Sequence, residues 1–395
     1  MTIGGSTAET ELATLAPWAD RAPAISQDER RDRLTQVRER MAAMGAQALL
    51  VNAGMSLRYF AGVPWGATER LVAMLLPLHG EPVMICPRFE LGSLTADMAF
   101  SADMRLWEED EDPFALVAAS LGGVTTLAID PALPFQMAER LRRAAPQVTL
   151  VDGAPAIDGC RMRKSPAEIA LMQQAKNMTL EVHRRAARIL QPGITTGAVK
   201  RFIDQAHRAL GAAGSSFCIV QFGHATAFPH GLPGEQALEE NQLVLIDTGC
   251  TIEGYHSDIT RTYAFGRVSD EEQAIWSLEK EAQAAAFAAA APGVPCEQVD
   301  AAARAVLEKA GLGPDYRLPG LPHRTGHGIG LSIHEPAYLV RGDRTPLDTG
   351  MCFSNEPMIV VPDRFGIRLE DHFYMTDTGP RWFTEPQPTI DRVVG

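Results

Sequence analysis

The sequence predicts two domains, an α/β domain followed by an α+β domain in which one arrangement of elements occurs twice. Three observations support this fold class. Apolar runs of strand length alternate with segments of helical periodicity between residues 26 and 158. A short polar stretch over residues 158–164 then leads into a long helical segment, and the residues after Pro192 resemble those after Pro292. We therefore expect a loose N-terminal arm over residues 1–25, the α/β domain over 26–158 and the α+β domain over 159–395.

The first domain begins with a helix. Ser26 and Glu29 have the spacing of a capping box, and apolar residues then recur at helical intervals as far as Met44, before Gly45 ends the helix. Strands are predicted over 48–51, 71–76, 82–85, 126–129 and 147–151, and helices over 113–121 and 135–145. This half contains no phosphate loop and no dinucleotide fingerprint, so the sequence assigns it no chemistry of its own.

The second domain repeats a helix, a Pro-Gly stop, an amphipathic helix and a set of strands. A capping box at Ser165 and Glu168 starts the first long helix, and a second helix is predicted over 270–291. Chance likeness between Ala-rich helices is an alternative explanation. The matched order of elements, with an acid-rich hairpin after each copy, favours a duplicated unit that has a site between its two copies.

Composition excludes several functional classes. The chain has 395 residues with 36 Lys+Arg against 49 Asp+Glu, and this net charge of −13 argues against nucleic-acid binding. The longest apolar runs, such as residues 71–78, are too short to span a bilayer, and no secretory signal is expected. The six cysteines form no CxxC pair, which is typical of free thiols in a reducing compartment. We expect a cytoplasmic protein without nucleic-acid or membrane partners.

The first hairpin of the second domain carries two acids in apolar surroundings. Asp247 ends the buried strand pattern 243–246, and Asp258 stands in another strand pattern eleven residues later. A turn that uses Gly249 and Gly254 would bring the two carboxylates together. One such acid could be a solvated turn residue, but two buried carboxylates must be paired or bound to metal.

The second hairpin places Glu356 at the end of one strand pattern and Glu370 in the next. Arg368 lies two residues before Glu370, so both side chains are expected on the same strand face. Between the hairpins, His327 is bracketed by glycines, and His334 follows seven residues later.

Four converging carboxylates and one imidazole would repel each other unless cations neutralised them. Two divalent ions would do so. Oxygen-rich ligation with a single histidine favours Mn²⁺, Co²⁺ or Fe²⁺, with Zn²⁺ as a further alternative. Such a pair of ions lowers the pKa of a shared water towards about 7 and suits hydrolysis of an amide. The sequence shows no zincin helix, dinucleotide loop or covalent nucleophile motif.

From about Ile157 onward the chain resembles the pita-bread metallopeptidases, a family that includes prolidases, aminopeptidases P, methionine aminopeptidases and the non-metal creatinases. The resemblance rests on the segments DTGCTIEGYHSDITRTY, GHGIGLSIHE, NEP and RLED. The first half, with NAGMSLRYFAGVPW, resembles the creatinase/prolidase-type N-terminal domain. The resemblance therefore implies a pita-bread catalytic domain with an internal pseudo-two-fold repeat.

Carried over to this sequence, the resemblance implies a ligand set of five residues. Asp258 and Glu370 would bridge two ions, most simply two Mn²⁺. Asp247 would complete one coordination shell, and His327 with Glu356 the other. Glu356 would also accept and return the proton of the bridging water.

Three further residues match substrate-contacting positions of the family. His230 would contact the scissile carbonyl oxygen, His334 would lie near the residue after the scissile bond, and Arg368 would orient the substrate. On the residues alone, His230 is better explained as a turn residue after Pro229, and only its context favours the substrate role. Arg368 is equally a structural partner of an acid. At position 252 many prolidases carry a tyrosine, and the isoleucine found here cannot make its hydrogen bond.

The resemblance implies a homodimeric Xaa-Pro dipeptidase whose substrates are Xaa-Pro dipeptides or short peptides. Aminopeptidase P activity on longer peptides is the first alternative. A repurposed lyase and a non-catalytic binding module are the others, and the complete ligand set counts against both.

Overall fold

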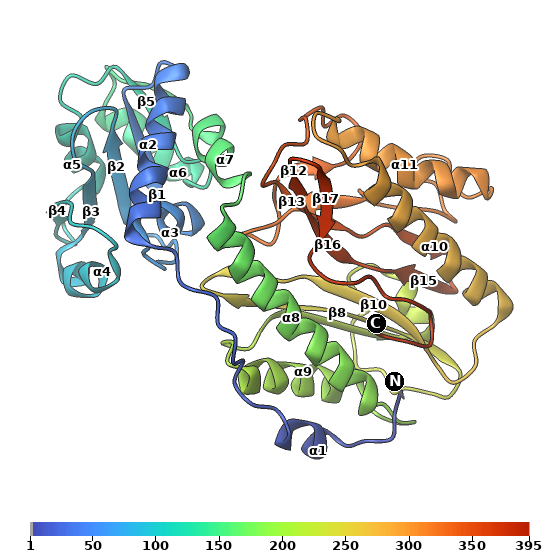
Figure 1. Cartoon of the computed structure of the whole chain (residues 1–395). Coiled ribbons are helices and arrows are strands. Elements are labelled where there is room, and N and C mark those ends of the chain that lie inside the picture. Colours follow the sequence, from blue (N-terminus) through green and yellow to red (C-terminus); the bar gives the residue numbers. More distant parts are fainter. Residues whose placement is uncertain (1–2, 395) are drawn as a thin grey trace. The chain divides into compact units, whose positions relative to one another are not determined.

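The computed structural model describes residues 3–394, which form two compact units (Figure 1). One unit comprises residues 25–161, and the other combines residues 3–24 with residues 162–394. Among these residues, no helix is long and apolar enough to cross a membrane.

The unit over residues 25–161 is built on a six-stranded sheet of order β4-β3-β2-β1-β5-β6. Its strands are β1 (Ala48–Asn52), β2 (Ala73–Pro77), β3 (Val83–Pro87), β4 (Asp103–Trp107), β5 (Thr126–Ile129) and β6 (Thr149–Asp152). Strand β2 is antiparallel to both neighbours, and the other pairs are parallel. The helices are α2 (Gln27–Ala43), α3 (Met55–Ala61), α4 (Leu91–Asp97), α5 (Pro113–Ser120), α6 (Phe135–Ala144) and α7 (Ala154–Arg161). The predicted α/β class is confirmed.

Some of these elements were not expected from the sequence. Helices α3 and α4 and strand β4 have only five to seven residues, too few for a clear periodicity. Helix α7 covers much of the stretch that the sequence predicts as a polar break, because Ile157 and Cys160 give it a buried face.

The second unit contains two successive sets of a helix pair and antiparallel strands. The first set consists of α8 (Pro166–Arg188), α9 (Thr196–Leu210), β7 (Ser215–Phe222), β8 (Gln242–Ile252), β9 (Tyr255–His256) and β10 (Ile259–Phe265). The second consists of α10 (Asp270–Ala289), α11 (Cys296–Lys309), β11 (Gly326–Gly328), β12 (Glu335–Leu339), β13 (Cys352–Asn355), β14 (Met358–Val361), β15 (Phe365–Arg368), β16 (Asp371–Thr376) and β17 (Gly379–Trp382). This order matches the repeat predicted from the sequence.

Each helix pair covers the strands of its own set. The first strands form the sheet β10-β8-β7 with β9 attached to β8, and the second form β12-β11-β13-β16-β17 beside the pair β14-β15. Helices α8 and α9 share one apolar cluster with β7 and β8, and α10 and α11 share another with β13 and β16. The capping box predicted at the start of α8 is present: the side chains of Ser165 and Glu168 each accept a hydrogen bond from the backbone amide of the other residue.

Residues 3–24, expected as a loose arm, pack on this second unit. They include helix α1 (Ala8–Ala13), and their backbone amides bind carbonyls at the ends of α8 and α9: Gly4 N to Ala187 O at 2.8 Å, and Trp18 N to Leu210 O at 2.8 Å. The carboxylate of Glu11 pairs with Arg185 at 3.0 Å. The sequence shows few apolar periods here, but Ile3, Leu12, Leu15 and Trp18 all pack against the apolar cluster of α8 and α9.

Candidate metal centre

A cavity of about 390 Å³ opens in the second unit where the two sets of strands meet. Its lining includes every residue predicted for the site: Asp247, Asp258, His327, Glu356 and Glu370, together with His230, His334 and Arg368. The eight residues that the sequence predicts for one site therefore line one cavity.

The first two acids lie on neighbouring strands. Asp247 is in β8 and faces Thr260 of β10 in the register, and Asp258 directly precedes β10. The turn between them is made by Glu253 and Gly254, both with positive φ. Gly249, which the sequence suggested as part of this turn, instead lies within β8. A Cβ there would come within 1.9 Å of the carbonyl oxygen of Ser257, so glycine permits a close approach of two backbones.

The second pair of acids is fixed by the backbone. Glu356 follows β13, and its amide donates to the Thr325 carbonyl at 2.8 Å. Glu370 lies between β15 and β16, and its amide donates to the Thr260 carbonyl at 3.0 Å. The hydroxyl of Thr260 also donates to Oε2 of Glu370 at 2.7 Å. Thr260 thus links the two hairpins directly beside the carboxylates.

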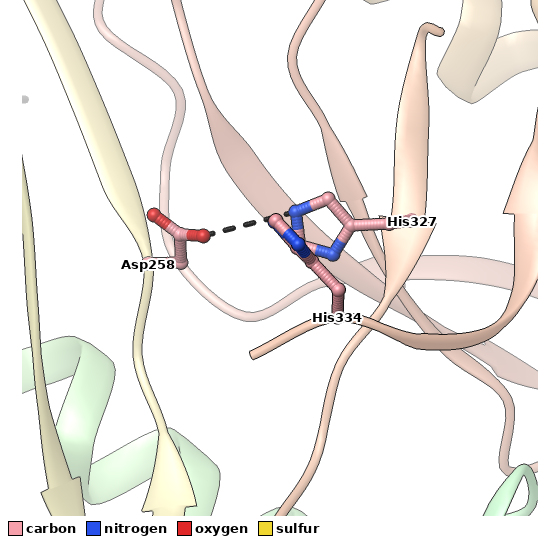
Figure 2. Close-up of side chains that lie close together, drawn as sticks. All are labelled: Asp258, His327 and His334. Carbon is pink, nitrogen blue, oxygen red and sulfur yellow. Dashed lines mark ion pairs between the residues drawn. The ribbon is translucent and has the colours of Figure 1, made fainter. Parts of the chain in front are cut away.

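His327, in β11, presents one ring nitrogen to the acids. Its Nδ1 donates to the Gly328 carbonyl at 3.0 Å, so Nε2 faces Oε1 of Glu356 at 3.1 Å and Oδ2 of Asp258 at 3.7 Å. Figure 2 shows this approach to Asp258 and the neighbouring ring of His334. The two rings are 4.2 Å apart between centroids and inclined by 70°. A histidine held by a carbonyl on one nitrogen and free to bind on the other is the usual form of a metal ligand.

The electrostatics of the cluster fit divalent cations. Burial, followed by repulsion from neighbouring carboxylates, raises the pKa of Asp258 and of Glu370 well above the ordinary range. Burial also raises the pKa of Asp247, although Arg368 acts in the opposite direction. Oδ1 of Asp247 and Oε1 of Glu370 are buried and accept no hydrogen bond. Buried carboxylate oxygens without partners are costly, and divalent ions would bind them.

The other predicted residues occupy the rim and the floor. His230 and His334 are exposed side chains in the cavity lining, where they can reach a bound molecule. Arg368 is buried, and its Nη2 donates to Oδ2 of Asp247 at 2.6 Å while its Nε donates to Oγ1 of Thr260 at 3.2 Å. In this structure Arg368 is therefore a partner of an acid at the site.

Sequence reasoning missed several residues in or beside the cavity. Thr260, which contacts Glu370, could have been found, because it alternates with Asp258 on one strand face. The lining residues Phe217, Ile219, Pro322, His323, Arg324 and Ile333 carried no comparable signal. Ile252 packs in the apolar cluster of α8 and α9, not in the cavity lining. Tyr255, three residues later in the chain, donates its hydroxyl to Oε1 of Glu168 at 2.9 Å.

Comparisons with known proteins agree with this geometry. The sequence pattern of metallopeptidase family M24 matches residues 170–377, and that of the creatinase/prolidase N-terminal domain matches residues 33–163. A probable dipeptidase, PepE, of Mycobacterium tuberculosis is 39% identical over 343 residues, which cover 85% of this chain and 89% of that protein. An Xaa-Pro dipeptidase of Lactobacillus helveticus is 33% identical over 338 residues, with coverages of 84% and 90%. The crystal structure of dipeptidase PepE from Mycobacterium ulcerans has a TM-score of 0.87 and 36% identity, and covers 94% of this chain and 99% of that one.

Proposed function

Because this chain belongs to metallopeptidase family M24, we propose that it is a two-metal dipeptidase that cleaves the peptide bond before proline in Xaa-Pro dipeptides. The observation that carries the proposal is the convergence of four carboxylates, three of them buried, and one imidazole on a single cavity, with unpartnered oxygens on Asp247 and Glu370.

The proposed ligand roles are those that the family resemblance implies. Asp258 and Glu370 would be shared between the two ions, Asp247 would bind one of them, and His327 with Glu356 would bind the other. Two Mn²⁺ ions are proposed, with Co²⁺, Fe²⁺ and Zn²⁺ as alternatives. When bound, the ions supply Lewis acidity, which lowers the pKa of a water nucleophile towards about 7.

The protein's own groups would move the protons and orient the substrate. The hydroxyl of Ser354 donates to Oε1 of Glu356 at 3.2 Å, which helps to orient this carboxylate. It would accept the proton of the attacking water and deliver it to the leaving nitrogen. His230 would donate to the carbonyl oxygen as negative charge develops there, and His334 would contact the residue after the scissile bond.

The size of the cavity supports a small substrate. A volume of about 390 Å³ is near the lower end of the ~300–1,000 Å³ typical of small-molecule sites. Relatives named as dipeptidases are 33% and 39% identical to this chain, which also favours dipeptides over the longer substrates of an aminopeptidase P. The preference for proline is a separate step of the proposal, because the PepE relatives are named only as dipeptidases.

The proposal is tested with metal-stripped protein reconstituted with Mn²⁺. Three substrates are compared: an Xaa-Pro dipeptide, a dipeptide without proline, and a longer Xaa-Pro-Xaa peptide. We expect metal-dependent release of proline from the first alone. Preferred cleavage of the second would make the protein a general dipeptidase, and cleavage of the third an aminopeptidase P. If two ions bind but no peptide is cut, the lyase alternative replaces hydrolysis.

We also propose that the protein is a homodimer, as the family resemblance implies. Light scattering during size-exclusion chromatography measures this directly, because one chain has a mass of 42.8 kDa. A particle of that mass at working concentrations would contradict the proposal.

A further inference from the structure

One buried histidine beside the metal centre has no hydrogen bond on either ring nitrogen. His372 lies in β16 and is fully buried, and both its Nδ1 and its Nε2 are unpartnered. Buried polar atoms are nearly always paired, so two orphaned atoms on one ring call for an explanation.

Nε2 of His372 points towards the proposed ligands. It lies 3.8 Å from Oε1 of Glu370, and the ligand atoms of Asp258, Glu370 and His372 are all within 4.8 Å of one another. Oε1 of Glu370 is itself the oxygen that accepts no hydrogen bond. An orphaned nitrogen and an orphaned oxygen therefore face each other across a gap only about 0.6 Å beyond hydrogen-bond range.

An imidazole carries an N–H in both its neutral and its protonated form, so His372 can donate a hydrogen bond in either state. The ammonium of Lys176 is close enough to act electrostatically on this ring. Lys176 is itself fully buried and donates to the His256 carbonyl at 3.1 Å. A buried ammonium beside the ring also disfavours a divalent cation on His372, because like charges repel strongly where the dielectric is low. Donation of a hydrogen bond fits this environment better than metal ligation.

With this hydrogen bond, each carboxylate oxygen of Glu370 would accept from one donor. Oε2 already accepts from the hydroxyl of Thr260 at 2.7 Å, whereas Oε1 lacks a donor. The terminal torsion of a glutamate is soft, so a small rotation of the carboxylate closes the remaining gap. Groups that hold a ligand from behind fix its orientation and typically contribute 10- to 100-fold to metal affinity.

We propose that His372 is a positioning residue of the metal centre, which donates its Nε2–H to Oε1 of Glu370 and holds that carboxylate in the orientation that binds the ions. The inference rests on the proposed two-metal function. It assigns His372 no direct contact with substrate or ion.

The test is calorimetric titration of metal-stripped protein with Mn²⁺, comparing three substitutions. His372→Gln places an amide donor near the position of Nε2, His372→Asn places it near Nδ1, and His372→Leu has no donor. We expect about 10- to 100-fold weaker Mn²⁺ binding in the Leu and Asn variants, with rescue by Gln. The control is His207→Leu, which removes another buried histidine whose nitrogens bind Thr179 at 3.2 Å and Ser215 at 2.9 Å. It should leave Mn²⁺ affinity unchanged.

The outcomes separate the two proposals. Equal Mn²⁺ affinity in the parent and all three His372 variants would overturn the positioning role, and so would equal loss in all three, which indicates direct ligation. If the parent protein itself binds no Mn²⁺, the two-metal function fails instead. Should the Leu variant not fold by circular dichroism, the comparison of Gln with Asn still decides.

Discussion

Replacing Arg261 by methionine should destabilise the metal-binding unit by about 3–5 kcal/mol, the usual cost of removing one partner from a buried ion pair. Arg261 and Asp371 are fully buried and joined at 2.6 Å. The guanidinium also donates to three carbonyls: Val393 at 3.0 Å, Thr260 at 3.0 Å and Glu370 at 2.8 Å. Methionine preserves the apolar stem of the side chain but removes these three hydrogen bonds and leaves Asp371 without its counter-charge.

Native-state hydrogen exchange measures this loss of stability in the strands that contain Arg261 and Asp371. Peptides from β10 and β16 should exchange roughly 100- to 4,000-fold faster in the variant, since about 1.4 kcal/mol corresponds to tenfold. Peptides from β1 and β5, in the other unit, serve as an internal control and should not change. The double variant Arg261→Met/Asp371→Asn removes the stranded charge and should recover part of the loss. A double variant whose loss equals the sum of the two single losses would refute the ion-pair explanation.

The remaining predictions concern the site and the thiols. Asp258→Ala should abolish peptidase activity and reduce bound metal, measured by elemental analysis; full turnover would contradict the two-metal arrangement. His230→Ala should lower kcat with metal content unchanged, whereas loss of metal would make it a ligand. Thr260→Val removes the donor to Glu370 and should weaken Mn²⁺ binding about 10- to 100-fold by calorimetry; unchanged affinity would show that this contact is dispensable. Burial raises the pKa of the Cys86 thiol to about 11, and it raises those of Cys218, Cys296 and Cys352 to about 12. Iodoacetamide at pH 8 should therefore label none of these four thiols in the folded protein and all four after unfolding, which mass spectrometry measures.

The sequence was most informative where a residue contradicted its local pattern. Acids such as Asp247 and Glu370 stand among apolar residues, and this conflict predicts the metal site from the sequence alone. Thr260 and His372 are ordinary polar residues in strands, and only the packing of one hairpin on the other gives them a role. No periodicity in the sequence encodes that packing.

The same distinction explains which elements were predicted. Long helices such as α8 and α10 carry both capping boxes and periodicity, and they occur where expected. The boundaries of α7 and the packing of residues 3–24 depend on contacts with residues distant in the chain. Local propensity does not contain that information.

The packing of residues 3–24 has a consequence for how this protein can be assembled. Ile3 and Trp18 pack against the same apolar cluster that contains Val393 and Val394, so opposite ends of the described chain complete one core. Contacts of such wide sequence separation form late, because closing a long loop costs entropy before the contacts repay it. A ribosome must therefore release the chain from Ile3 to Val394 before this core can close. Until then helices α8 and α9 expose apolar surface, and chaperones would have their longest opportunity to bind there.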